Sequence, residues 1–125
     1  MNAKAEPISK EELQRVFDLQ RVNQWTVRRS SAEQRIAKLQ RLKSAIQARE
    51  QAVNEALRAD LRRNEESAAI EFSSVYTDIE DAVANLESWM EPVEVATSAA
   101  FAEARARMVY EARGVVLLFG PWNYP

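Results

Sequence analysis

The chain has 125 residues, with 17 lysines and arginines against 19 aspartates and glutamates, a formal net charge of −2, and neither histidine nor cysteine. The lack of cysteine excludes disulfides and thiolate chemistry from these residues, and the lack of histidine removes the usual zinc ligand and the usual base at neutral pH. Because acidic residues interleave with the arginines and leave no broad basic field, we expect no nucleic-acid partner. Because the chain has neither histidine nor a closed loop of oxygen ligands, we expect no metal.

The start of the chain and its hydropathy favour a cytoplasmic location. Residues 1–7 hold no apolar stretch of the kind that a secretory signal needs, and no apolar run approaches the length that spans a membrane. Association with a membrane through a segment after Pro125 is compatible with this expectation.

Two capping signals predict the starts of the first two helical regions. Ser9 is followed by Glu12, and Ser30 is followed by Glu33, the spacing at which a serine and a glutamate cap each other's backbone. Apolar residues at helical spacing follow the first signal and predict a helix that runs to about Arg28.

Further helices are expected up to Pro92. The apolar stripe of the second helical region is offset near Arg49 and Glu50, which leaves room for a break there. Asn64 is a suitable cap for another long helix, and Pro92 ends that helix because proline cannot continue it.

Two strands are expected after Pro92. Residues 104–110 alternate between small or apolar side chains and a face that carries Arg105 and Arg107, as in a half-exposed strand. The run Val115–Phe119 is apolar throughout, which is typical of a strand that is covered on both faces. Such a strand needs partners on its edges, so we expect these residues to be the amino-terminal part of a longer protein. The segment as a whole is therefore predicted to be mostly α, with three to four long helices and then two strands.

The turn GPWNYP at residues 120–125 is the candidate site. In a parallel α/β sheet, ligands bind at the carboxyl ends of the strands, and this turn directly follows the most apolar run. Gly120 allows close approach of the backbone to a ligand, Pro121 fixes the backbone, and the amide of Asn123 can donate to a developing oxyanion. A rigid structural turn, with Asn123 as the turn former, explains the same residues, so these residues alone leave both interpretations open.

The segment VVLLFGPWNYP (residues 115–125) resembles the segment that opens the cofactor domain of aldehyde dehydrogenases, and its last six residues resemble the class 3 branch, with its fatty-aldehyde and coniferyl-aldehyde relatives. Three stretches upstream are similar to the same branch: EALRADLRR (55–63), LESWMEP (86–92) and VYEARG (109–114). The resemblance extends from about Leu13. Ala112 stands where the family usually has proline, a change that removes no chemical group.

The resemblance implies an α/β Rossmann-like aldehyde dehydrogenase fold and a division of the chain within it. Residues 1–92 would be a helical segment that packs on the cofactor domain. Residues 93–113 would be a connection and a bridging strand used in oligomerisation, and residues 114–125 would begin the NAD(P)-binding domain. The family further implies an aldehyde substrate, NAD or NADP as cofactor, and a homodimer.

The resemblance also implies roles for residues of the turn. Asn123 matches the asparagine whose side-chain amide stabilises the oxyanion of the thiohemiacetal. Residues lining the cofactor cleft are matched by Phe119, Gly120, Pro121 and Trp122, and Tyr124 matches a residue near the substrate passage. The family's cysteine nucleophile and general-base glutamate are expected after Pro125, so these 125 residues alone are not expected to be catalytically competent.

A different class of protein stays open beside this one. The apolar stripes of the helical regions would also suit a small helical interaction module without catalysis, whose stripes dock a partner helix. That hypothesis explains roughly the first ninety residues and gives no reason for the apolar run or for the turn around Asn123.

Overall fold

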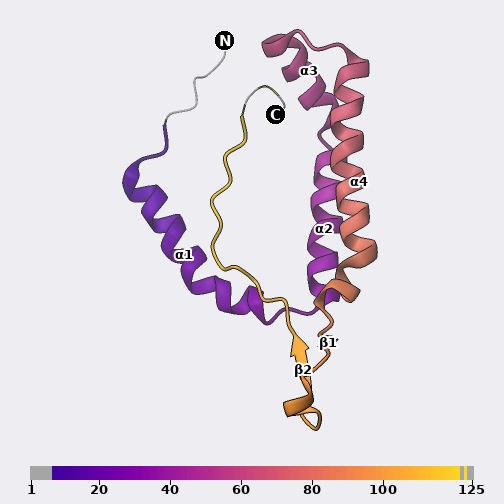
Figure 1. Cartoon of the computed structure of the whole chain (residues 1–125). Helices are drawn as coiled ribbons and strands as arrows, with labels where there is room; N and C mark the ends of the chain where they lie inside the picture. Colours follow the sequence, from indigo (N-terminus) through magenta and orange to yellow (C-terminus); the bar gives the residue numbers. More distant parts are fainter. Residues whose placement is uncertain (1–6, 122, 124–125) are drawn as a thin grey trace. The chain divides into compact units, whose positions relative to one another are not determined.

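In the computed structural model, which describes residues 7–121 and residue 123, most of these residues are helical (Figure 1). The elements in chain order are α1 (Lys10–Arg28), α2 (Ala32–Gln47), α3 (Glu50–Leu61), α4 (Glu65–Met90), β1 (Val93–Val95), a 3₁₀ turn (Ala99–Phe101) and β2 (Ala106–Met108). The predicted class, mostly α with two short strands, is confirmed.

The chain divides into two compact units. One unit combines Met1–Ser30 with Glu111–Leu118, and the other combines Ser31–Tyr110 with Phe119–Pro125. Each unit therefore brings together residues that are far apart in sequence.

Helix α1 begins at the predicted cap, Ser9, with one half of the predicted reciprocal cap. The Ser9 hydroxyl accepts a hydrogen bond from the backbone N–H of Glu12 at 3.1 Å. Both carboxylate oxygens of Glu12 accept from the guanidinium of Arg15, each at 2.7 Å, and this bond holds the pKa of the Glu12 carboxyl below its usual value. The Glu12 side chain therefore supports the first turn of the helix through Arg15.

Helix α2 begins one residue later than predicted. Its cap is Ser31, whose hydroxyl accepts from the N–H of Gln34 at 3.2 Å, while the Gln34 side chain accepts from the N–H of Ser31 at 3.1 Å. The expected pairing of Ser30 with Glu33 is wrong because the Ser30 hydroxyl donates to the Val27 carbonyl at 2.5 Å. Glutamine serves as well as glutamate in this reciprocal cap.

The second unit is built on the packing of α2 along α4, with α3 against the same helix. The predicted break falls between Gln47 and Glu50, where α2 ends and α3 begins. Leu57 of α3 and Ile79 of α4 are 5% and 7% exposed and lie in the core of this unit. Polar side chains join the same helices at their surface, where Lys43 of α2 forms an ion pair with Glu80 of α4.

Strands β1 and β2 form an antiparallel hairpin with Val93 opposite Met108 and Val95 opposite Ala106. Directly opposed side chains share a face, so these four make one apolar face, and the central pair of Glu94 and Arg107 lies on the other. The alternation predicted around Ala106 and Met108 is thereby confirmed.

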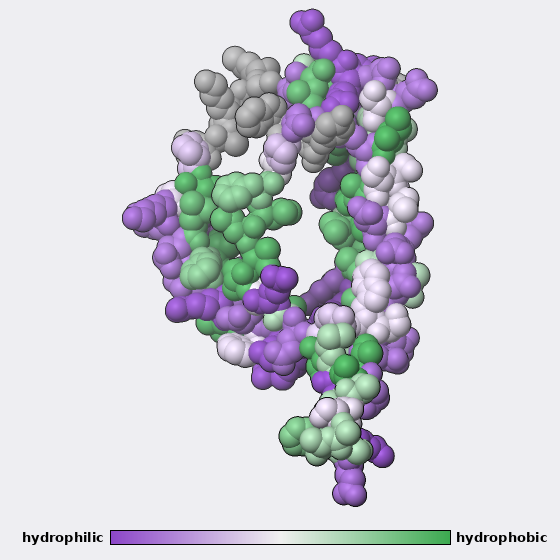
Figure 2. All heavy atoms as spheres, viewed as in Figure 1, coloured by the Kyte–Doolittle hydropathy of each residue, from purple (hydrophilic) through white to green (hydrophobic). Residues whose placement is uncertain are grey.

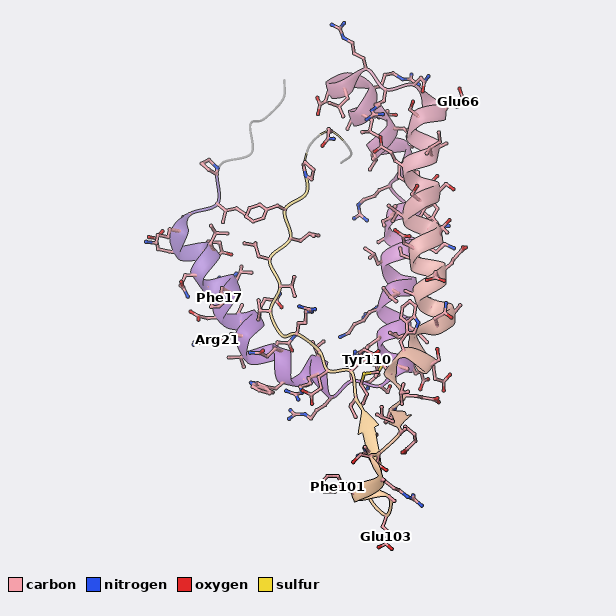
Figure 3. All side chains as sticks on the ribbon, viewed as in Figure 1. Phe17, Arg21, Glu66, Phe101, Glu103 and Tyr110 are labelled. Atoms are coloured by element: carbon pink, nitrogen blue, oxygen red, sulfur yellow. The ribbon has the colours of Figure 1, made fainter. Side chains whose placement is uncertain are left out.

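The hairpin is shorter than the strand predicted over residues 104–110. Ala104 instead donates its N–H to the Phe101 carbonyl at 2.9 Å. This bond lies in the turn that closes the hairpin, where Figure 3 labels Phe101 and Glu103. Since β1 has three residues, only three residues of β2 can pair with it in the ladder of hydrogen bonds. The residues expected to form an extended connection after Pro92 are themselves β1.

In the first unit, the apolar face of α1 lies against the chain that follows β2. Figure 2 shows hydrophobic side chains gathered between these two segments. The groove between them is lined by Leu13, Val16, Phe17, Gln20, Gln24 and Val27 of α1 and by Ala112 and residues 114–117. The stripe predicted on this helix is thus the face that meets the later segment.

The prediction of a buried strand at Val115–Phe119 is wrong for the described structure. These residues pair with no strand in the described part of the chain, and their exposed fractions run from 38% at Val115 to 88% at Leu118. A strand is defined by its ladder of hydrogen bonds to a neighbour, and the two strands described here pair only with each other. That these apolar residues need a cover stays a prediction.

Among the helices of the described residues, none combines the length and the apolar character that would let it cross a bilayer.

Candidate functional site

The site is built on the corner between α3 and α4. Helix α3 ends with Arg62 in the left-handed conformation, at φ 54°, and the Arg62 N–H bonds to the carbonyls of Arg58 and Leu57. The N–H of Arg63 also reaches the Leu57 carbonyl, at 3.3 Å. The backbone of Arg63 is therefore tied to the end of the preceding helix.

The residue after Arg63 ties the corner to the next helix. Asn64 caps α4 by accepting from the N–H of Ser67 at 2.8 Å, as its sequence position predicts. Directly inside this cap, Ala68 is 2% exposed and packs into the core of the unit. Arg63 thus stands between two capped helix ends, which leaves its backbone little freedom.

The side chain of Arg63 connects this corner to the predicted site. Its Nη2 donates to the backbone carbonyl of Asn123 at 2.7 Å and lies 3.7 Å from Oε1 of Glu71. The side chains of Arg63 and Glu71 are only 26% and 18% exposed. Charge-assisted hydrogen bonds of this kind are shorter and stronger than neutral ones, and partial burial limits screening by solvent.

Glu71 lies on α4, about two turns from the Asn64 cap, and its Oε1 is buried without a hydrogen-bond partner among the described residues. This oxygen lies 3.7 Å from Nη2 of Arg63, with which Glu71 forms an ion pair. A buried carboxylate oxygen of this kind needs a nearby positive charge, because its own desolvation is otherwise uncompensated. Arg63 therefore has partners on two sides: Glu71 and the Asn123 carbonyl.

The structure places part of the predicted turn. Phe119, Gly120, Pro121 and Asn123 are all exposed, whereas Trp122 and Tyr124 lie outside the described residues. A Cβ built on Gly120 meets no heavy atom within 4 Å, so the backbone is open there, as a close approach by a ligand requires. The carbonyl of Asn123 is brought to the α3–α4 corner, 60 residues earlier in the chain.

Arg63 and Glu71 were not predicted as site residues. Both carry charges on helices rich in charge, where an exposed, ion-paired surface is the ordinary interpretation. The available signal was the position of Arg63, a basic residue between a helix end and a helix cap, with an acidic residue about two turns further on. That signal predicts a salt bridge across a corner, and only the folded chain adds the Asn123 carbonyl as its third member.

A second polar cluster joins α3 to α4. The Tyr76 hydroxyl donates to the Glu50 carboxylate, and Lys43 Nζ lies 5.7 Å from the centre of the Tyr76 ring. Burial, the hydrogen bond to Glu50 and the negative charge of Glu50 together raise the pKa of Tyr76 to about 12. A phenol held neutral in this way stabilises the contact between helices and is unsuited to proton transfer near neutral pH.

Within the described residues, no group of three or more histidine, cysteine, aspartate or glutamate side chains is arranged to hold a metal ion.

Comparison with known proteins gives the class of this helical segment and its terminal turn. The profile of the Aldehyde dehydrogenase family matches residues 2–125. The chain belongs to the aldehyde dehydrogenase family.

Its relatives include members of family 3 of these enzymes. The chain is 43% identical over 117 residues to AldX of Bacillus subtilis, covering 93% of this chain and 26% of AldX. It is 36% identical over 99 residues to aldehyde dehydrogenase family 3 member I1, chloroplastic, of Arabidopsis thaliana, covering 78% of this chain and 18% of that protein. A probable coniferyl aldehyde dehydrogenase of Pseudomonas aeruginosa is 31% identical over 116 residues, which are 91% of this chain and 24% of the relative.

The expected resemblance to the class 3 branch is confirmed by these relatives. The chain spans 26% or less of the length of the three relatives described above.

Proposed function

We propose that this chain is part of an NAD- or NADP-dependent enzyme that oxidises an aldehyde to a carboxylic acid. The observation that carries the proposal is the family match over residues 2–125, which includes the turn with Asn123. The relatives described above include proteins named for aldehyde oxidation, one of them for coniferyl aldehyde. The alternative, a helical interaction module, offers no reason for this match.

In the proposed reaction, the task of Asn123 is to stabilise negative charge. When a nucleophile adds to the aldehyde carbon, charge develops on the aldehyde oxygen, and a fixed amide N–H stabilises that oxygen most in the transition state. Because this chain has no cysteine, the thiolate nucleophile that the family resemblance implies would come from residues outside it.

The residues before Asn123 are proposed to line the cofactor cleft. The open backbone at Gly120 and the exposed side chains of Phe119 and Pro121 suit a flat ring that lies against the turn. NAD or NADP, when bound, supplies the hydride acceptor. The contribution of this chain is to shape one wall and to exclude water from it. Trp122 is proposed for the same wall and Tyr124 for the substrate passage.

We also propose that the complete enzyme is a homodimer that uses the hairpin of β1 and β2. The proposal is supported by the exposed apolar face of the hairpin. This face includes Val93, Val95 and Met108, each between 45% and 49% exposed. Paired apolar side chains at the surface of a short hairpin gain free energy when a second sheet or strand covers them.

The oxyanion role is tested by replacing Asn123 in the complete enzyme with alanine and, separately, with aspartate. We expect Asn123→Ala to lower kcat by about a hundredfold or more, with little change in cofactor affinity. Turnover is measured from the absorbance of the reduced cofactor with an aromatic and a long-chain aldehyde.

Asn123→Asp separates the oxyanion role from a purely structural turn. Aspartate has nearly the same shape and also favours turns, but it has no N–H to donate and adds a negative charge. We expect this variant to be at least as impaired as Asn123→Ala while its melting temperature stays near that of the wild type. Wild-type turnover in Asn123→Asp would leave Asn123 as a turn former only.

A further inference from the structure

Three charged or polar groups meet at the α3–α4 corner although they come from separate parts of the chain. Arg63 lies between the helices, Glu71 lies inside α4, and the Asn123 carbonyl belongs to the candidate site. One guanidinium nitrogen, Nη2 of Arg63, is 2.7 Å from the Asn123 oxygen and 3.7 Å from Oε1 of Glu71. This arrangement connects the helical part of the chain directly to the residue proposed to stabilise the oxyanion.

We propose that Arg63, held by Glu71, is a positioning residue that fixes the Asn123 turn for catalysis. The inference rests on the proposed function of Asn123 and adds a residue that acts on it from the helical part. Arg63 contacts the backbone carbonyl of Asn123, which leaves the side-chain amide of the same residue available to a substrate oxygen.

The base of this contact is rigid. The Arg63 N–H is bonded to the Leu57 carbonyl, and Leu57 is 5% exposed in the core of the unit. Asn64, the next residue, is bonded to the first turn of α4. A guanidinium that projects from a backbone held on both sides can transmit the position of the helices to the turn.

Glu71 sets the direction of the guanidinium. Its Oε1 is buried and has no hydrogen-bond partner among the described residues, so the positive charge of Arg63 is favoured beside it. The charge of Glu71 thus restricts the rotamers of a long side chain, and a restricted donor loses less entropy when it bonds to the Asn123 carbonyl. In this arrangement, the ion pair between Arg63 and Glu71 serves to fix the direction of the Arg63 guanidinium.

The test compares Arg63→Met with Arg62→Met in the complete enzyme. The two variants remove the same charge from neighbouring positions, and Arg62 is exposed and contributes its backbone to the corner. We expect Arg63→Met to lower kcat by about ten- to a hundredfold, since a small displacement of a reacting group can cost that much, with the KM for the aldehyde within about twofold. Arg62→Met should keep wild-type kinetics.

Two further variants distinguish positioning from general support of the fold. Arg63→Lys keeps a cation that can donate one hydrogen bond, and it should recover part of the lost kcat. Glu71→Gln keeps the shape of the side chain without its charge, and it should show a smaller loss than Arg63→Met. A loss of kcat that is equal in Arg63→Met and Arg63→Lys would contradict the proposed contact.

Hydrogen–deuterium exchange of the complete enzyme gives a readout that does not depend on activity. In Arg63→Met, we expect faster exchange in the peptide of residues 117–123, with unchanged exchange across α4. Unchanged exchange in that peptide overturns the proposal, and so does faster exchange with wild-type kcat. If the wild-type enzyme oxidises no aldehyde, the proposed function fails, whereas the exchange result still decides whether Arg63 holds the turn.

Discussion

The two glycines of the chain differ in what their missing side chain permits. Gly114 has φ +95°, a conformation that other residues rarely adopt, and a Cβ built on it would lie 2.7 Å from Oε1 of Gln24 in α1. Gly120 has open space where its Cβ would be. The lack of a side chain at Gly114 therefore allows the chain to pack on α1, and the lack of one at Gly120 leaves space for a ligand.

This difference predicts different outcomes for the same substitution. Gly114→Ala should lower the free energy of unfolding by about 1 kcal/mol or more, because alanine is strained at this φ even after Gln24 moves aside. Gly120→Ala, its matched control, should change that free energy by less than about 0.5 kcal/mol. Urea titrations of the two variants provide the measurement, and equal destabilisation would refute the assigned role of Gly114.

At the scale of the elements, the contact between Tyr76 and Glu50 joins α4 to the first residue of α3. The Tyr76 ring also stacks on Phe72, with 6.2 Å between ring centres. Because Tyr76 contributes a phenol, the strength of this contact depends on pH in the alkaline range.

The pH dependence has a definite sign. The pKa of Tyr76 is raised from 10.0 to about 12 by burial and by Glu50, so the folded protein keeps a proton that the unfolded chain releases. The contribution of Tyr76 to stability is therefore complete below pH 10 and is lost as the pH rises from 10 toward 12.

The loss of stability between pH 10 and pH 12 should be steeper in the wild type than in Tyr76→Phe, which has no phenolic proton to lose. Chemical unfolding at several pH values measures the difference, and Tyr110→Phe, at a tyrosine that is 65% exposed, is the control. Parallel pH profiles for the wild type and Tyr76→Phe would exclude this role of the Tyr76 proton.

The elements that the sequence predicted well are those encoded by neighbouring residues. Ser9 and Asn64 cap the expected helices because a cap and its partner N–H are three residues apart. The error at Ser30 has the same local origin, since two adjacent serines compete and one is occupied by the Val27 carbonyl. The length of β2 could not be predicted from residues 104–110, because it depends on how many residues β1 offers.

The candidate site shows the corresponding limit at the scale of the whole molecule. Asn123 could be selected from the motif around it, whereas its bond to Arg63 joins residues 60 positions apart. Nothing near either residue in the sequence indicates the other. The apolar run at Val115–Phe119 likewise indicates that these residues need to be covered, but it does not indicate which residues cover them.

The most exposed part of that run predicts how the 125-residue chain behaves in solution. Leu117, Leu118 and Phe119 are 76%, 88% and 84% exposed, and contiguous apolar surface of this kind promotes association. We expect the chain to associate as its concentration rises, and Leu118→Lys to reduce this association. Val22→Lys, at a valine of α1 that is 73% exposed and lies outside this run, should have a smaller effect. Sedimentation velocity over a range of concentrations measures the result; equal effects of the two lysines would contradict it.

The groove between α1 and residues 112–117 sets an order of events during synthesis on the ribosome. The two sides of this groove are separated by about 100 residues, which take roughly 5–20 s to translate at typical rates. Helix α1 is therefore made first and receives its partner last, after α2, α3 and α4 have had time to fold together. During that interval its apolar face is open to a chaperone, and the arrival of residues 112–117 covers part of that face.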